Sequence, residues 1–252
     1  MKQKTKSKEN NILPPTLDVV FQSLFGEIGS ESITTSFLEA ILNTKINDID
    51  LSKNLVLRRE HVDDKLGILD VIARLNGNEY CNIEMQCSTK DNIKERMLFY
   101  WSKLYTKQMK KSNDYSTLNK TIGILIADFN VDGLEGLEYC TSWRIIEEKY
   151  RKTILTEKLE LYIIELPKIK NLKNEKSALL DWLFFLVNPK SERVFKKMKE
   201  NKQLKEAYNK LEQISNDEQM QRLAELRQKA IWDKNTAINA GFRKRYRSWL
   251  KD

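Results

Sequence analysis

Two acidic residues on either side of a tight turn are the residues best placed to do chemistry. Asp70 lies in the apolar segment 67–75, and Glu84 lies in the segment 79–87. Between the segments stands Asn76-Gly77-Asn78, a strong signal for a β-hairpin. Side chains alternate between the two faces of a strand, so the register of this hairpin decides whether the carboxylates meet.

The length of the turn sets that register. A three-residue loop places Leu75 opposite Glu79, and Asp70 then falls directly opposite Glu84. A two-residue loop would put the two carboxylates on opposite faces and would break up the apolar face of the hairpin. We therefore expect the three-residue loop, in a hairpin with a glycine-assisted bulge.

This register gives the hairpin one apolar and one mixed face. We expect the apolar face to be core, and it collects Leu69, Val71, Ala73, Leu75, Cys81, Ile83, Met85 and Cys87. The mixed face collects Ile68, Asp70, Ile72, Arg74, Asn82, Glu84 and Gln86. Its polar groups gather at one end.

Two carboxylates directly opposite each other destabilise a sheet, because their Cβ atoms lie ~5 Å apart. A divalent cation between the two carboxylates turns this repulsion into attraction. Hard cations such as Mg²⁺ prefer carboxylate and carbonyl oxygens. The alternative is a solvent-facing pair in which Arg74 neutralises one acid. The apolar back face and the nearby Gln86 favour a metal site at Asp70 and Glu84.

The arrangement of Asp70, a turn and Glu84-Met85-Gln86 resembles the PD-(D/E)xK nuclease core, with glutamine at the usual lysine position. The resemblance extends over about residues 13–130. It is carried further by Asp18-Val19-Val20-Phe21, Leu24-Phe25-Gly26-Glu27, Phe37-Leu38-Glu39-Ala40-Ile41-Leu42-Asn43, Arg96, Tyr100, Trp101, Leu104, Tyr105, Gln108 and Tyr115. Together these segments resemble the PD-(D/E)xK transposase-like family, which is related to the recombination-promoting nucleases.

The resemblance implies a mixed sheet flanked by helices and Mg²⁺-dependent cleavage of DNA, with Mn²⁺ as an alternative cation. It implies Asp70 and Glu84 as metal ligands, and the carbonyl of Met85 as a third. It also implies a catalytic role for Asp18, at the early acidic position of the family. Glu39 is a weaker candidate.

Gln86 departs from the usual pattern of this superfamily. A glutamine can orient a water molecule, but it cannot act as a cation or as a general base. Activation of the water would then fall on the metal ion, which lowers the pKa of bound water. Gln86 is nevertheless counted among the expected catalytic residues.

A helix expected over residues 92–111 carries a candidate DNA-binding stripe. Arg96, Tyr100, Lys103 and Lys107 follow one another at i, i+3 and i+4 spacing. Arginine and lysine neutralise phosphates, and tyrosine stacks or donates a hydrogen bond. The alternative is a solvated face with snorkelling lysines.

The net charge of +8 lies entirely in the last third of the chain. Residues 171–252 carry 19 basic and 11 acidic side chains, and residues 1–170 carry 25 of each. In the tail, Arg243 and Arg245 interleave with aromatic residues, which suits contact with a DNA backbone. A frayed helix end is the competing interpretation.

The order of expected elements predicts an α/β fold with an all-helical C-terminal extension. We expect a flexible basic arm over 1–12, a PD-(D/E)xK nuclease-like domain over 13–170 and a basic helical extension over 171–252. The expected strands span 55–59, 67–75, 79–87, 120–129 and 159–166. The expected helices span 17–25, 92–111, 175–187, 191–214 and 216–240, with one more beginning after Ser30.

Composition argues against several other kinds of site. His61 is the only histidine, so histidine-rich metal sites and Ser-His-Asp catalysis have little to work with. Cys81, Cys87 and Cys140 form no CxxC pair, which argues against a thiolate zinc site and a disulfide framework. No stretch approaches the ~18 apolar residues of a membrane span, and no apolar signal-peptide core follows the N-terminus. We therefore expect a cytoplasmic location.

The leading functional hypothesis is a Mg²⁺-dependent DNA endonuclease of a transposase-like or recombination-promoting system. A homodimer would suit double-strand cutting. One alternative is a catalytically weak or inactive DNA-binding protein that retains the nuclease fold. Another is a protein-interaction module that assembles through its C-terminal helices.

Overall fold

The computed structural model describes residues 12–51, 71–88, 92–110, 112 and 114–249. Side chains are described as far as residue 237, except at 234. The basic arm expected over 1–12 therefore lies almost wholly outside the described residues. So do the expected strand 55–59, Asp70 and the side chains of Arg243 and Arg245.

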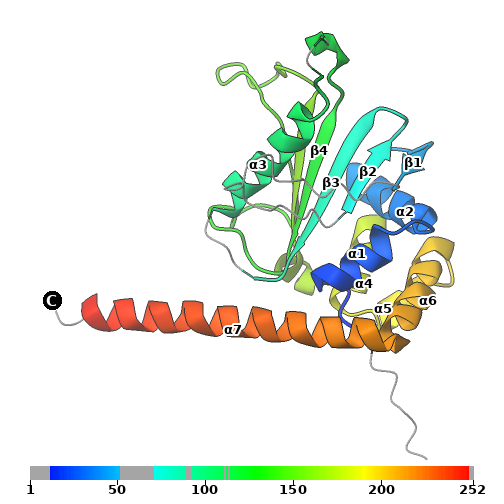
Figure 1. The fold of residues 1–252 in the computed structure, drawn as a ribbon, viewed down its shortest axis with the longest axis vertical. Coiled ribbons are helices and arrows are strands. Elements are labelled where there is room, and N and C mark those ends of the chain that lie inside the picture. Colours follow the sequence, from blue (N-terminus) through cyan, green and yellow to red (C-terminus); the bar gives the residue numbers. More distant parts are fainter. Residues whose placement is uncertain (1–11, 52–70, 89–91, 111, 113, 250–252) are drawn as a thin grey trace, which may run out of the picture.

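A mixed six-stranded sheet forms the centre of the molecule, with the strand order β1-β2-β3-β4-β6-β5 (Figure 1). The strands are β1 (Ile49–Asp50), β2 (Val71–Leu75), β3 (Glu79–Gln86), β4 (Thr121–Ala127), β5 (Cys140–Trp143) and β6 (Leu159–Glu165). The central strands β3, β4 and β6 are parallel, and the outer pairings are antiparallel. Every residue of β4 and β6 is buried, as expected for parallel strands that are covered on both faces.

The hairpin between β2 and β3 has the expected register. Val71 pairs with Ile83 and Leu75 pairs with Glu79, so the loop has three residues. Asn76 and Gly77 both have positive φ, at 49° and 79°, which lets the chain reverse so tightly. The three-residue loop is confirmed. The partner position of Glu84 in this register is residue 70, just beyond the described end of β2.

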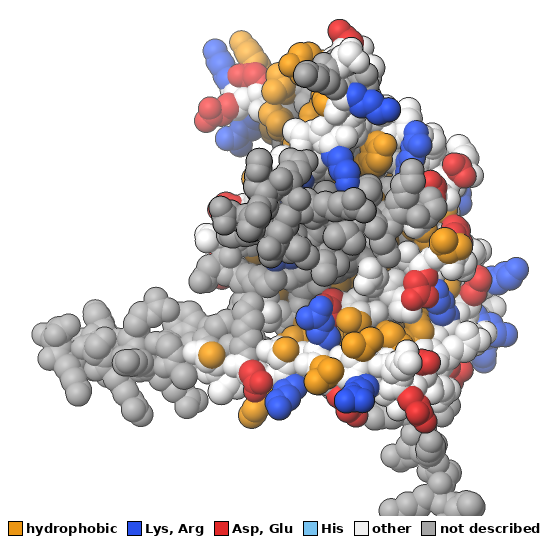
Figure 2. Space-filling model, in the orientation of Figure 1, with side chains coloured by type: hydrophobic (Ala, Val, Ile, Leu, Met, Phe, Trp, Pro, Cys, Tyr) orange, Lys and Arg blue, Asp and Glu red, His pale blue; other side chains and the backbone are white. Residues whose placement is uncertain are grey.

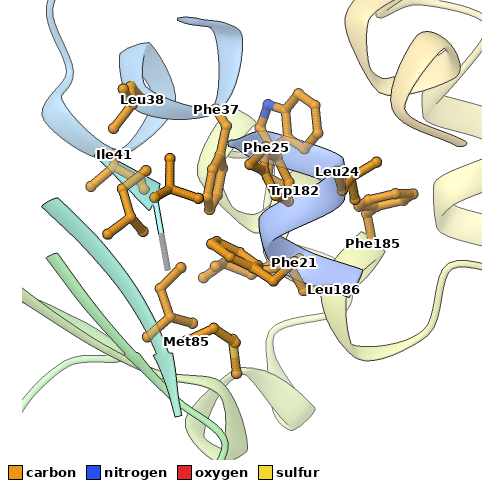
Figure 3. Packing of buried hydrophobic residues seen from close by; sticks show 14 of the residues in the cluster. Phe21, Leu24, Phe25, Phe37, Leu38, Ile41, Met85, Trp182, Phe185 and Leu186 are labelled. Atoms are coloured by element: carbon orange, nitrogen blue, oxygen red, sulfur yellow. The ribbon is translucent and has the colours of Figure 1, made fainter. Parts of the chain in front are cut away.

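The apolar face of the hairpin shares one hydrophobic core with helices from both ends of the chain (Figure 1). These helices are α1 (Asp18–Phe25), α2 (Glu31–Leu42), α4 (Ala178–Val187), α5 (Glu192–Lys197) and α6 (Lys202–Asn216). At the centre, Phe25 and Phe37 lie with ring centroids 4.8 Å apart, and Trp182 lies 5.6 Å from Phe37. Figure 3 shows Met85 of β3 in the same hydrophobic cluster as these aromatic residues. Residues on both sides of position 170 thus share one core, while the division into domains stays a prediction.

The opposite face of the sheet is covered by α3 (Ile93–Thr106). Gly123 of β4 lies beneath this helix, and an added Cβ would lie 2.9 Å from Leu161 Cδ2 of β6 and 3.5 Å from Met97 Cε of α3. The indole N–H of Trp101 donates to the carbonyl of Thr121 at 2.8 Å, which fixes the middle of α3 over β4. The helix is shorter at its C-terminal end than the expected 92–111.

Beyond the sheet the chain is helical, as expected, but the helix expected over 191–214 is wrong. It is two helices, α5 and α6, because the side chain of Asn201 accepts from the backbone N–H of Leu204 and starts a new helix there. The last helix, α7 (Glu218–Trp249), packs near its start against α1 and α6 and then runs away from the body (Figure 1). No described helix is both long and apolar enough to cross a membrane.

One strand also differs from expectation, the edge strand β5. Its last residue, Trp143, is 39% exposed, and Tyr150 is 66% exposed. Trp143 ends the edge strand β5, which the sequence did not reveal because Cys-Thr-Ser-Trp has no marked apolar alternation. Short 3-10 helices at Tyr115–Thr117 and Leu166–Asn171 complete the described elements.

Candidate active site

Glu84 is a buried carboxylate on the sheet face that α3 covers. It is 4% exposed. On the neighbouring strand β4 it lies opposite Leu125, which belongs to the apolar cluster beneath α3. Its Oε1 accepts from the Nδ2 of Asn82 at 3.2 Å. Its Oε2 lies 3.5 Å from the Nε of Arg96, which comes from the first half of α3. Burial and an adjacent cation therefore define the surroundings of this acid.

Arg96 makes an incomplete pairing with Glu84. At 3.5 Å the two charges form an ion pair, yet the Nε of Arg96 is buried and has no hydrogen-bond partner among the described residues. The guanidinium lies over the ring of Tyr100, 4.9 Å from its centroid. Tyr100 itself is 5% exposed. Two expected DNA-binding residues are thus brought together, directly above the expected metal ligand.

Two other buried glutamates of the sheet each lie closer to a positively charged side chain than Glu84 does. Glu165 is fully buried, accepts from the backbone N–H of Val131 at 2.8 Å and lies 2.5 Å from the Nζ of Lys168. Glu160 lies 2.5 Å from the Nζ of Lys120 and also pairs with Arg144. Arg96 lies 3.5 Å from Glu84, which is a full ångström farther than these lysines lie from their glutamates. Among the described ion pairs of these three buried glutamates, the pair of Glu84 with Arg96 is the widest.

Asn82 belongs to the site, although its position in the sequence predicted no functional role for it. It is 4% exposed, and while its Nδ2 donates to Glu84, its Oδ1 has no hydrogen-bond partner among the described residues. A buried polar atom of this kind is costly unless something else binds it. The sequence signal is the two-residue spacing to Glu84, which puts both side chains on one strand face.

The next two residues of β3 continue the site. The carbonyl of Gln86 accepts from the N–H of Asp128, so the backbone groups of Gln86 face β4. Because these groups alternate along a strand, the carbonyl of Met85 faces the β2 side, where the chain leads to residue 70. The side chain of Gln86 projects from the same face as Glu84 and is partly exposed. Burial raises the pKa of Asp128, against the opposing charge of Lys170.

Asp18 lies at the start of α1, close to the end of β3 but engaged elsewhere. The thiol of Cys87 donates to the carbonyl of Thr16 at 2.7 Å, which ties the two segments together. The Oδ2 of Asp18 lies 3.0 Å from an Nη of Arg227 in α7. Leu17 occupies the N-cap position of α1. In the described structure the Asp18 carboxylate thus joins α1 to α7.

Glu39, the weaker acidic candidate, stabilises the turn after α2. Its Oε1 accepts from the backbone N–H of Ile46 at 3.0 Å, and its Oε2 pairs with Lys45 at 3.2 Å. In the described structure both carboxylate oxygens of Glu39 are thus engaged at this turn.

The remaining DNA-binding candidates follow α3 away from Glu84. The Nζ of Lys103 lies over the ring of Phe99, 4.9 Å from its centroid. Lys107 lines a pocket of about 200 Å³ with Asp50, Ile72, Arg74, Tyr80, Leu104 and Gln108. The exposed Arg74 lies 5.9 Å from the centroid of the Tyr80 ring and adds a cation that the sequence did not assign to DNA. Arg243 and Arg245 belong to the far end of α7.

The oxygen donors near Glu84 fit a hard divalent cation. No group of three or more His, Cys, Asp or Glu side chains comes together in the described part of the chain, and Asp70 lies outside it. That part contributes the Glu84 carboxylate, the Met85 carbonyl and the unsatisfied Oδ1 of Asn82. Carboxylate, carbonyl and amide oxygens are the donors that Mg²⁺ and Mn²⁺ take.

Comparison with known proteins identifies the family of the chain. A family model described as "PD-(D/E)XK nuclease family transposase" matches residues 15–241. No curated protein matches the chain. No solved structure matches it either. The family match spans the sheet, the helices on both of its faces and most of α7. The chain therefore belongs to the PD-(D/E)XK nuclease family transposases.

Proposed function

We propose that this protein is a Mg²⁺-dependent DNA endonuclease of a transposase-like or recombination-promoting system. The observation that carries the proposal is the buried Glu84, followed two residues later by Gln86, on the face of β3 beneath a basic helix. A nuclease of this family hydrolyses phosphodiester bonds, and the site offers the oxygen donors that such chemistry requires.

Within this proposal, Asp70, Glu84 and the carbonyl of Met85 hold the cation, and Mn²⁺ can replace Mg²⁺. When bound, the cation lowers the pKa of a water molecule and stabilises the negative charge that develops on the phosphate. Gln86 orients the attacking water through its amide but takes no proton. Asp18 can reach this role only if its carboxylate leaves Arg227.

The DNA backbone would lie across α3 and the neighbouring strands. Arg96, stacked on Tyr100, is nearest to Glu84, and Lys103 and Lys107 follow it along the helix. Arg74 pairs with Tyr80, which lies four residues along β3 from Glu84, or ~13 Å at the rise of a strand. The pocket that Arg74 and Lys107 share therefore suits another phosphate of the same DNA strand, with Arg243 and Arg245 as more distant contacts.

Nicking of supercoiled plasmid during a magnesium titration tests the proposal. Wild-type protein should nick DNA only with Mg²⁺ or Mn²⁺, and Asp70→Ala and Glu84→Gln should abolish nicking while circular dichroism spectra stay unchanged. Glu79→Gln is the matched control, because Glu79 lies on the same strand at its opposite end and pairs with Leu75. Undiminished nicking by the Asp70 or Glu84 variant would contradict the assignment.

A second candidate is a DNA-binding protein with weak or no catalysis, favoured by Gln86 at the lysine position. It predicts salt-dependent DNA binding without nicking at any Mg²⁺ or Mn²⁺ concentration. A third is an interaction module, favoured by the exposed Leu223, Leu226 and Trp232 of α7. Sedimentation velocity of the full chain, with and without Trp232→Ala, tests both this module and a homodimer.

A further inference from the structure

We propose that Arg96 is a positioning residue that exchanges between Glu84 and a DNA phosphate, and that it thereby couples cation binding to DNA binding. The inference rests on the proposed function, since it takes Glu84 as a ligand of the divalent cation. It adds a second state of Arg96, in which its charge occupies the place of the cation when neither cation nor DNA is bound.

The contact between Arg96 and Glu84 is weak. A charge-assisted N–H···O hydrogen bond is ~2.7–2.9 Å long. Here the Nε of Arg96 lies 3.5 Å from the Oε2 of Glu84, and this buried Nε has no hydrogen-bond partner among the described residues. By contrast, Lys168 approaches Glu165 to 2.5 Å. Arg96 compensates the charge of Glu84 without being fixed to it.

Arg96 also has an outward path. Its side chain is 29% exposed, whereas that of Glu84 is 6% exposed. The guanidinium therefore lies between the buried acid and the surface of α3. The guanidinium of Arg96 lies over the ring of Tyr100, 4.9 Å from its centroid. The ring face attracts the guanidinium whether its N–H groups point to Glu84 or to a phosphate. A turn of the side chain toward solvent exchanges one anion, Glu84, for another, a phosphate.

These two features of Arg96 have a thermodynamic consequence. A divalent cation on Glu84 competes with the charge of Arg96, so Arg96 weakens cation binding as long as DNA is absent. DNA that takes Arg96 removes this competition, and by linkage the cation strengthens DNA binding by the same factor. If Arg96 only held Glu84 in place, its loss would have the opposite effect on cation affinity. Glu84 would then be poorly placed, and cation binding would weaken.

Titration calorimetry of the full chain with Mn²⁺, without DNA, separates these two roles. Arg96→Gln should bind Mn²⁺ more tightly than wild type, by about 5-fold at the lower end of ordinary coupling factors. Arg74→Gln is the matched control, because it removes an arginine from the same sheet face at a position away from Glu84. It should change Mn²⁺ affinity by less than about 2-fold, since exposed charges beyond about 10 Å are largely screened.

DNA binding supplies the second readout. Fluorescence anisotropy with a labelled duplex is compared in EDTA and in Ca²⁺, and a denaturing gel verifies that the duplex stays intact. Wild type should bind the duplex more tightly in Ca²⁺. Arg74→Gln should bind more weakly in both buffers but keep the Ca²⁺ enhancement, whereas Arg96→Gln should lose most of it. Arg96→Lys, which retains the charge, should restore part of the enhancement.

The outcomes also distinguish this inference from the proposed function. Equal or weaker Mn²⁺ binding by Arg96→Gln, with binding abolished in Glu84→Gln, overturns the exchange and leaves the metal site intact. Wild-type Mn²⁺ affinity in Glu84→Gln overturns the proposed site and the exchange together. If thermal melting shows that Arg96→Gln is unfolded, Arg96→Met keeps the packing on Tyr100 and is measured in its place, with the same criteria.

Discussion

At the scale of single residues, Glu84 combines burial with a loosely held cation. Glu160 and Glu165 are equally buried, but each has a lysine at 2.5 Å. Such close pairs are what a purely structural buried acid requires. The wider spacing of the Glu84–Arg96 pair is accompanied by an Asn82 Oδ1 that has no hydrogen-bond partner among the described residues, and both features suit the binding of a divalent cation.

Asn82→Ala should weaken cation binding, because Glu84 loses the donor that orients its Oε1 and the site loses an amide oxygen. Residues that orient a metal ligand typically contribute 10–100-fold to metal affinity. We expect a loss of about 10-fold in Mn²⁺ affinity, measured by calorimetry. A variant with wild-type affinity would show that Asn82 serves only the packing of the hairpin.

Gln86→Ala should slow DNA nicking by about 10-fold or more while Mn²⁺ affinity stays unchanged, because the side chain positions water and holds no metal. Single-turnover nicking at saturating Mg²⁺ measures the rate, and calorimetry measures the affinity. Equal losses in both quantities would instead make Gln86 part of the cation site.

The sequence predicted these residues unevenly. The turn Asn76-Gly77-Asn78 and the apolar alternation sufficed to predict the register of β2 and β3 and the burial of the apolar face. The placement of Arg96 above Glu84 did not follow from spacing. A helical stripe tells which residues share a face, but not which of them reaches a given acid on a sheet. The unsatisfied atom of Asn82 required coordinates for the same reason.

At the scale of elements, the site depends on how closely α3 approaches β4. Gly123→Val should destabilise the protein by about 1–3 kcal/mol, the usual cost of overpacking, because the new side chain would meet Leu161 and Met97. Urea unfolding measures the change. Gly136→Val is the control, since nothing lies within 4 Å of a Cβ built at Gly136. Equal stability of the two variants would contradict close packing around Gly123.

At the far end of the sheet, Glu160 joins β6 to the segments around it through Lys120, Arg144 and Tyr162. Burial acts to raise the pKa of Glu160, but the hydrogen bonds from Lys120 and Arg144 outweigh it and lower the pKa below its ordinary 4.5. Glu160→Gln should therefore cost about 2 kcal/mol at pH 7, because hydrogen bonds to a charged group are lost.

The pH dependence of that cost follows from the sign of the shift. A carboxyl with a lowered pKa in the folded state contributes stability above its unfolded value, and this contribution is lost as the pH falls through the folded pKa. The difference between wild type and Glu160→Gln should thus shrink below pH 4.5. Urea unfolding at several pH values measures it. A difference that stayed constant down to pH 3 would contradict the ion-pair account.

Sequence patterns predicted the long strands and helices better than the short strand β5 and the break between α5 and α6. Long apolar segments gave β4 and β6 correctly, because buried parallel strands read as continuous apolar runs. The short edge strand β5 has no such run and was missed. The break between α5 and α6 depends on a cap at Asn201, a local signal inside an otherwise continuous helical pattern.

At the scale of the whole molecule, acids and positive charge are divided between different parts of the chain. The excess of +8 belongs to residues 171–252, whose last helix extends from the body (Figure 1). Figure 2 shows hydrophobic, basic and acidic side chains close together along the described part of α7. The family match reaches residue 241 and so includes most of this helix.

Removal of residues 241–252 should lower DNA affinity and its salt dependence. The segment contains Arg243, Lys244, Arg245 and Arg247, and each phosphate contact contributes about 0.9 to the slope of log affinity against log salt. The slope should fall by up to about 4. Anisotropy titrations at several salt concentrations measure it, and an unchanged slope would favour a helix end that touches no DNA.

The most direct test of the central claim is a crystal structure of the protein soaked in Mn²⁺, with anomalous diffraction to locate the ion. The account predicts an anomalous peak between the carboxylates of Asp70 and Glu84, with the carbonyl of Met85 among its ligands and Arg96 turned away from Glu84. A peak at another site, or Asp70 and Glu84 on opposite faces of the hairpin, would contradict it.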